Sequence, residues 1–297
     1  MAFGLKTFQD TVKREDLLDY ITNVDYTNTP LYSGLGTATA QNTIHQWPVD
    51  ILGAAADNGV IEGSDPTYAD HTQPTKITNL VQIFRKPVQV SDTERAVNIA
   101  GMTDAFNYQL KKASKEIARD IELTIVQGTL VSGQSGVPAK LNGCIAQIST
   151  NKTARDSGTS LTPTEFNDVF KGIFENGTDE VANETYVGSY LKRVISQMTV
   201  GDTKYREVKD KRIWDTVSVY ESDFGETRIY LSRYIPSGGL LAINPEFLKI
   251  AYLTGRTPKY VPLAKTGSST KGMIEGELTL EVLAEQTAAY RSGLFVG

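Results

Sequence analysis

Apolar residues recur at helical spacing through the middle of the chain. From Met102 to Gly128 they form one stripe with charged residues between its members: Met102, Phe106, Leu110, Ala113, Ile117, Ile121 and Ile125. Intervals of three and four residues are typical of an amphipathic helix. At 1.5 Å per residue this helix would be about 40 Å long, so we expect it to support other elements.

A second helix is predicted at Thr162-Pro163-Thr164-Glu165. Threonine can cap the helix, proline suits the first helical position, and glutamate three residues after the cap completes a capping box. The apolar face of this helix would hold Phe166, Val169, Phe170, Ile173 and Phe174. A shorter helix is expected after Ser189.

Alternating apolar and polar residues predict strands on either side of a long connection. Residues 45–51 and 80–91 are interpreted as two long antiparallel strands, joined by a segment (53–79) rich in Gly, Ala, Asp, Thr and Pro. Loops of this length are usually functional or bound to a partner. Residues 1–40 contain few core-type side chains, so we expect them to lie as an arm on another surface, of this fold or of a neighbour.

The remainder of the chain is predicted to be mostly β. Residues 217–220 and 228–231 would form a hairpin, and 240–243 a buried strand. Leu278, Leu280 and Val282 alternate with Glu277, Thr279 and Glu281, which predicts a half-buried strand with a solvated acidic face. Helices and strands interleave without a repeating βαβ unit, which indicates the α+β class.

The composition excludes several classes of function. The 297 residues carry 30 Lys and Arg against 35 Asp and Glu, a net charge of −5, which disfavours a broadly basic nucleic-acid-binding protein. One cysteine excludes an intrachain disulfide framework, and two histidines leave few ligands for a zinc site. Neither an 18-residue apolar run nor a signal-peptide pattern occurs, so we expect cytosolic synthesis and no membrane partner.

A search for catalytic chemistry finds no constellation. Cys144 lacks a protease signature, His45 is interpreted as structural, and His71 as a solvated loop residue. The run Gly267–Gly272 lacks the spacing of a phosphate loop, and Lys204–Arg212 is interpreted as an exposed loop. Acidic residues of the long connection do not match a calcium loop: Asp57, Glu62, Asp65 and Asp70. No catalytic, cofactor-binding or metal residue is assigned.

The order of elements, together with a series of short motifs, resembles the major capsid proteins of tailed bacteriophages with the Hong Kong 97-type fold. The N-terminal half is similar to that of the short, podophage-type group. The motifs are Arg14-Glu15-Asp16-Leu17, the run Asp25–Gly36, His45-Gln46-Trp47 with Asp50, Glu62-Gly63-Ser64-Asp65, Val88–Ser91, Tyr108-Gln109-Leu110, Lys115-Glu116, Arg119–Glu122 and Lys265–Gly267 through Glu277–Glu281.

The resemblance implies a division of the chain into five parts. These are an N-terminal arm (1–40), an extension loop (41–91), a peripheral domain with its spine helix (92–175, helix 102–128), a mainly axial domain (176–260), and a C-terminal strand returning to the peripheral domain (261–297). No scaffolding segment precedes the matching arm, so a separate scaffolding protein is expected. Lys76 and Lys86 are present, but no covalent cross-link is predicted.

The resemblance also implies partners and location. The protein would associate with itself in hexamers and pentamers around double-stranded DNA, with a portal protein and possible decoration proteins. It would be assembled in the host bacterial cytoplasm and reside in the virion. The alternatives are another structural virion component, such as a decoration or tail protein, and more remotely a hydrolase using Cys144 or the loop carboxylates.

Overall fold

Three sheets and six α-helices make up the part of the chain that the computed structural model describes, which comprises residues 28–53, 55–66, 68, 73–97, 104–155, 160–176, 181–201 and 219–294. The helices are α1 (Pro30–Gly34), α2 (Asp92–Ala96), α3 (Ala105–Gln127), α4 (Cys144–Gln147), α5 (Pro163–Glu175) and α6 (Ser189–Gly201). The strands are β1 (Gly36–Ala40), β2 (Ile44–Val49), β3 (Thr75–Leu80), β4 (Gln82–Ser91), β5 (Lys152–Ala154), β6 (Glu184–Val187), β7 (Val219–Ser222), β8 (Gly225–Leu231), β9 (Leu240–Ile243), β10 (Leu248–Leu253), β11 (Lys259–Pro262), β12 (Ser269–Val282) and β13 (Ala289–Ser292).

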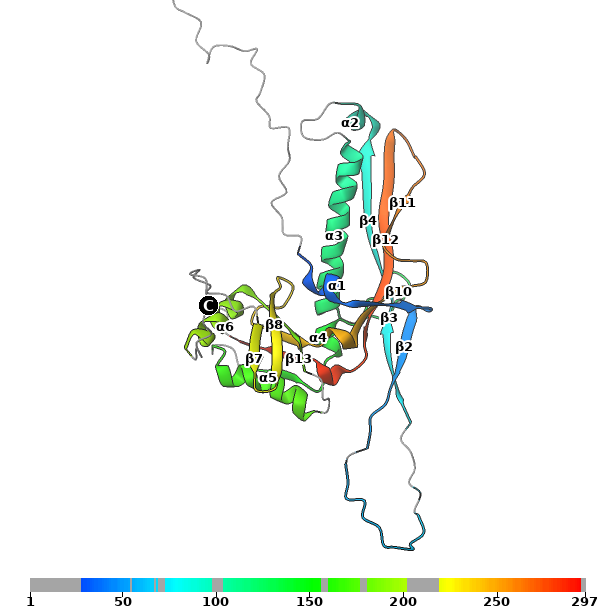
Figure 1. The fold of residues 1–297 in the computed structure, drawn as a ribbon. Helices are drawn as coiled ribbons and strands as arrows, with labels where there is room; N and C mark the ends of the chain where they lie inside the picture. The colour runs from blue at the N-terminus through cyan, green and yellow to red at the C-terminus, as the bar shows by residue number, and fades with distance from the viewer. Residues whose placement is uncertain are drawn as a thin grey trace, which may run out of the picture.

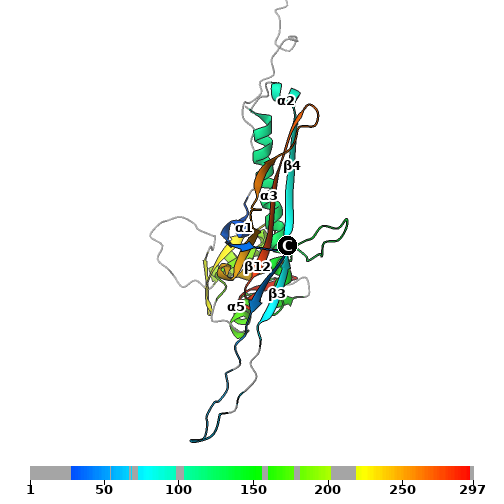
Figure 2. The same ribbon diagram turned by 90° about the vertical axis from the view of Figure 1, so that its right-hand side faces the viewer.

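A long stem forms one end of the molecule. Its five-stranded sheet has the order β1-β10-β12-β11, and β4 pairs with β12 on the free side of that strand. The antiparallel β4–β12 pairing runs from Ser91 opposite Ser269 to Gln82 opposite Leu278. Helix α3 lies along this sheet in both ribbon views (Figures 1 and 2). The expectation that the long helix supports other elements is therefore confirmed.

Helix α3 buries the stripe that its spacing predicts. Five side chains of the predicted stripe are buried (Phe106, Ala113, Ile117, Ile121 and Ile125), and Leu110 is partly buried against the same core. The helix begins after Asp104, whose carboxylate accepts a hydrogen bond from the Phe106 amide at 2.9 Å. It ends at Gly128, where an added Cβ would lie 2.5 Å from the Thr124 carbonyl oxygen. Met102 lies outside the described residues.

A second body holds the six-stranded sheet, in the order β5-β13-β9-β6-β8-β7, with α5 and α6 against it. The capping box of α5 is confirmed, because Thr162 and Glu165 exchange both hydrogen bonds. The expected helix after Ser189, the hairpin (as β7–β8) and the buried strand 240–243 are also present, although residues 217 and 218 lie outside the described residues. Phe174, which was expected in the packed face of α5, is instead 63% exposed.

The pairing expected for the extension loop is wrong. The strand at 44–49 pairs with β3 at 75–80, within the segment interpreted as a connection, and the run 82–91 leaves to pair with β12. The physical reason lies in the apolar face of β4. Phe84, Val88 and Val90 are buried in the same core as α3, and this burial would be lost if β4 continued the ribbon.

The described part of the expected N-terminal arm lies on this fold, which is one of the two surfaces expected for it. Residues 30–40 pack on the protein's own stem, with Leu31 and Leu35 in the main core and β1 parallel to β10. Residues 1–27 lie outside the described residues. Its apolar contacts with the core are few and widely spaced, so the sequence gives little sign that this stretch enters the core.

Sheet membership shifts the expected domain boundaries. β5 and α5, assigned with the spine helix, belong with the six-stranded sheet, as does β13 near the C-terminus. Conversely, β10 and the first half of β11, which were assigned to the mainly axial domain, lie in the five-stranded sheet. The chain therefore crosses between the two bodies more often than contiguous boundaries allow.

The burial of α3 gives a stability prediction. Ile121→Ala removes a side chain with 0% exposure and should lower the free energy of unfolding of the subunit by about 2–5 kcal/mol, because a cavity remains. Leu123→Ala, on the same helix at 46% exposure, should change it by less than about 0.5 kcal/mol. Urea unfolding followed by circular dichroism measures both, and equal effects would show that the helix face is wrongly assigned.

Candidate assembly surface

The loop that joins β2 to β3 exposes apolar side chains. Five of them in the described part of the loop are 73–94% exposed: Ile51, Leu52, Val60, Ile61 and Tyr68. In both ribbon views the loop hangs away from the body (Figures 1 and 2). Exposed apolar groups that gather on one element mark a contact site for another molecule. This loop is the strongest candidate for an intermolecular surface.

The root of the loop is fixed rigidly to the stem. The Trp47 indole nitrogen donates a hydrogen bond to the Val282 carbonyl at 2.9 Å, and Trp47 is buried. His45, which was interpreted as structural, lies with Nε2 3.3 Å from a carboxylate oxygen of Glu281 and packs beside the Trp47 ring. The β2–β3 ribbon is therefore held at a set angle while its far end stays exposed.

Asn79 joins three elements at this root. Its buried side chain donates to the Leu280 carbonyl at 2.7 Å and to the Asn142 carbonyl at 3.0 Å. Its amide oxygen accepts from the Asn142 backbone at 2.8 Å. One asparagine thus ties the ribbon to β12 and to the segment between α3 and α4. Its role could not be predicted from the sequence, because an asparagine in a polar strand carries no distinctive signal.

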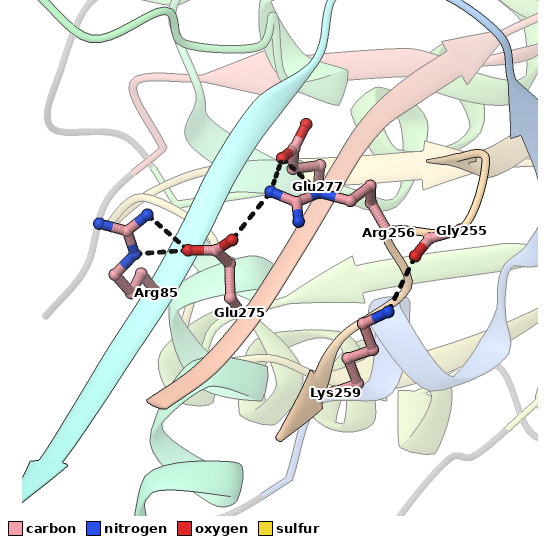
Figure 3. A network of polar contacts seen from close by, with 6 residues as sticks. All are labelled: Arg85, Gly255, Arg256, Lys259, Glu275 and Glu277. Carbon is pink, nitrogen blue, oxygen red and sulfur yellow. Dashed lines mark hydrogen bonds and ion pairs between the residues drawn. The ribbon is translucent and has the colours of Figure 1, made fainter. Parts of the chain in front are cut away.

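Charged residues clamp the stem on the sheet face away from α3 (Figure 3). Glu275 of β12 lies between two cations, 2.5 Å from Arg85 of β4 and 2.9 Å from Arg256 of the β10–β11 connection. Arg256 also donates to Glu277 at 2.6 and 2.8 Å. The hydrogen bonds and charge of Glu277, followed by those of Glu275, raise the pKa of Arg256. The prediction that Glu277, Thr279 and Glu281 form a solvated face is therefore wrong: Glu277 is 8% exposed, Thr279 is fully buried, and the side chain of Glu281 is mostly covered.

A further carboxylate is buried where α1 crosses α3. Glu122 is 0% exposed and accepts the backbone hydrogens of Leu31 at 3.1 Å and Tyr32 at 2.6 Å. Burial raises the pKa of Glu122 in spite of these two hydrogen bonds, which act in the opposite direction. This single side chain fixes the start of the described chain to the spine of the stem.

The remaining candidate residues form no reactive site. Cys144 is fully buried, and this burial raises the pKa of its thiol to about 12, so the nucleophilic thiolate is disfavoured. Gly267 turns the β11–β12 connection, and Asp57, Glu62 and Asp65 are exposed. His71, Asp70 and Lys204–Arg212 lie outside the described residues. Within the described ranges no three metal-ligating side chains cluster, and no helix is long and apolar enough to cross a membrane.

Solved structures share the fold of this chain. Residues align with the protein of Microbacterium phage Oxtober96 over 95% of this chain and 96% of that one, at 12% identity and a TM-score of 0.67. The capsid protein of the native GTA particle matches with 10% sequence identity and a TM-score of 0.68, over 97% of each chain. The capsid protein of cyanophage A-1(L) matches with 12% sequence identity and a TM-score of 0.67, over 98% of this chain and 99% of that one. The fold is the Hong Kong 97-type capsid fold.

Sequence comparison identifies the family. The model of the SU10 major capsid protein family matches residues 4–295. The chain belongs to this family of structural virion capsid proteins, which are not enzymes. The major capsid protein of Escherichia phage Phieco32 is 32% identical over 124 residues, which cover 41% of this chain and 35% of that protein. The alignment thus spans about a third of that relative's length.

The charged clamp can be tested by removing Arg256. Arg256→Met leaves the carboxylate of Glu277 buried without its cationic partner and should lower the free energy of unfolding. Lys112→Met, which breaks an exposed pair with Glu116 one helical turn away, should change it by less than about 0.5 kcal/mol. If chemical denaturation finds the two variants equally stable, the clamp does not stabilise the stem.

Glu122 predicts a pH dependence. The raised pKa means that the folded state releases this proton at higher pH than the unfolded state, so the contribution of Glu122 to stability falls as pH rises above 4.5. Glu122→Gln cannot accept both backbone hydrogens and should be less stable by about 1–3 kcal/mol, with a larger deficit at pH 5 than at pH 7. Unfolding at both pH values, with exposed Glu175→Gln as control, measures this. A deficit that grows with pH would contradict the assignment.

Proposed function

We propose that this chain is the repeating subunit of the icosahedral shell of a tailed bacteriophage, assembling with itself into hexamers and pentamers around double-stranded DNA. The observation that carries the proposal is the family match across residues 4–295. The exposed apolar loop supports it, because a subunit that folds alone would gain nothing from displaying these side chains. Membership of the podophage-type group is part of the proposal.

The parts of the fold receive roles in this proposal. The stem, built from α3 and the five-stranded sheet, corresponds to the peripheral domain, and the body with the six-stranded sheet to the axial domain. The β2–β3 ribbon with its loop corresponds to the extension loop, with bounds at 44–80 instead of 41–91. A separate scaffolding protein, a portal protein and decoration proteins remain proposed partners, and no covalent cross-link through Lys76 or Lys86 is proposed.

The energy of assembly would come from repeated modest contacts. Burying one Leu or Ile side chain contributes about 1.5–3 kcal/mol. The loop carries several such side chains at high exposure, so one loop docked on a neighbour would supply a useful fraction of an interface. Symmetry repeats each contact around the shell, so no single interface needs to be strong.

A double substitution in the loop tests the proposal. Leu52→Asp with Ile61→Asp should leave the unfolding midpoint unchanged, because both side chains are more than 80% exposed. Assembly should nevertheless fail, because two carboxylates would be buried without partners at the interface. Electron microscopy and sedimentation, with a scaffolding protein supplied, should find closed shells for the wild type and small oligomers for the variant.

The control adds the same two charges to polar positions of the same loop. Asn58→Asp with Ser64→Asp, both at exposed residues, should still form shells. Shells formed in normal yield by the apolar-to-aspartate variant would overturn the role of the loop. A wild-type protein that formed only one fixed small oligomer would overturn the shell itself.

A further inference from the structure

The outward side of α3 carries a row of positive charge. Lys111, Lys112 and Lys115 are exposed, and Arg119 continues the row by one turn. At 3.6 residues per turn these positions fall on the side of the helix opposite Ala113, Ile117 and Ile121, which are buried against the sheet. Positions four residues apart are spaced by about 6 Å along the helix axis. The first three lysines form what is called here the spine row.

The acidic residues of α3 do not cancel this row. Glu116 and Asp120 lie on the flank towards β4, where Lys86 Nζ is 2.8 Å from Asp120 and 3.9 Å from Glu116. Lys112 is 3.9 Å from Glu116, whereas Lys111 and Lys115 have no carboxylate within ion-pair distance among the described residues. A local surplus of positive charge thus stands on a chain whose net charge is −5.

No described element covers the spine row. In the two ribbon views the sheet lies on one side of α3, and α1 crosses only near the end of the helix that holds Glu122 (Figures 1 and 2). Covering by a protein partner would be unusual, because lysine is depleted at protein interfaces and the row has no apolar anchor between its members. Phosphate backbones instead reward closely spaced lysines through the release of condensed counterions.

We propose that the spine row is a docking surface for the phosphate backbone of double-stranded DNA, so that α3 faces the enclosed genome. The inference rests on the proposed function, since it gives the shell subunit a definite inner face. Contact would be independent of base sequence, because hydrogen bonds to phosphate oxygens carry no direct sequence information. Contact would also weaken steeply with salt.

The test uses the unassembled full-length subunit and a fluorescent 30-base-pair duplex, with binding followed by anisotropy between 25 and 200 mM NaCl. Lys111→Gln with Lys115→Gln removes two charges, so the slope of log K against log salt should become shallower by about 1.8. Lys111→Glu with Lys115→Glu should abolish measurable binding at the lowest salt. Its matched control, Lys76→Glu with Lys171→Glu, makes the same change in net charge at exposed lysines on β3 and α5 and should bind as the wild type does.

Several outcomes would overturn the inference. They are absence of duplex binding by the wild type at 25 mM NaCl, an equal loss in the control, and binding of poly-glutamate but not DNA, which would indicate an acidic protein partner. Images of DNA-filled particles that place α3 on the outer surface would do the same. None of these results affects shell formation, which is scored separately by microscopy of the same variants, so failure of the inference is distinguishable from failure of the proposed function.

Discussion

The packing of α3 against β4 and β12 is the interaction on which the rest of the structure depends. β12 is 14 residues long and pairs with β4 on one side and with β10 and β11 on the other, so it carries every strand of the stem sheet except β1. The apolar stripe of α3 covers one face of this sheet. Because helix and strand are both long, burial is spread along a thin body, which gives a large surface for its volume. In the proposed shell, neighbouring subunits would cover part of this surface.

Buried carboxylates make this thin stem specific. Apolar packing alone would tolerate sliding of one element along another, whereas each buried glutamate has partners at one position only. Glu122 accepts two backbone hydrogens of α1, and Glu275 accepts from both β4 and the β10–β11 connection. A shift by one residue would leave these groups buried and unsatisfied, at a cost of about 1–3 kcal/mol or more for each. The stem therefore has one register for its sheet and one docking position for α1.

Local patterns in the sequence predicted where helices and strands lie better than they predicted which strands pair and which side chains meet. The α3 stripe and the α5 capping box depend on residues within one or two helical turns, and both were confirmed. Strand pairing depends on residues far apart in sequence, and there the prediction failed, because alternation in 80–91 did not reveal that its partner is 269–282. The acidic face of β12 failed similarly, since the arginines that bury Glu275 and Glu277 lie on β4 and in the β10–β11 connection. Asn79 and Glu122 were missed because their roles exist only once distant backbones meet.

The two ends of the β2–β3 ribbon differ in how firmly the rest of the subunit holds them. The ribbon root is fixed by Trp47 and Asn79, so the direction of the extension is set before any neighbour arrives. Beyond the root, the described part of the loop is exposed, so in the proposed shell its further contacts would come from the neighbouring subunit. A fixed root limits the conformations lost on docking, while a free tip leaves the final contact adjustable. Subunits that occupy non-identical positions in a closed shell need this combination, because one sequence must meet neighbours at slightly different angles.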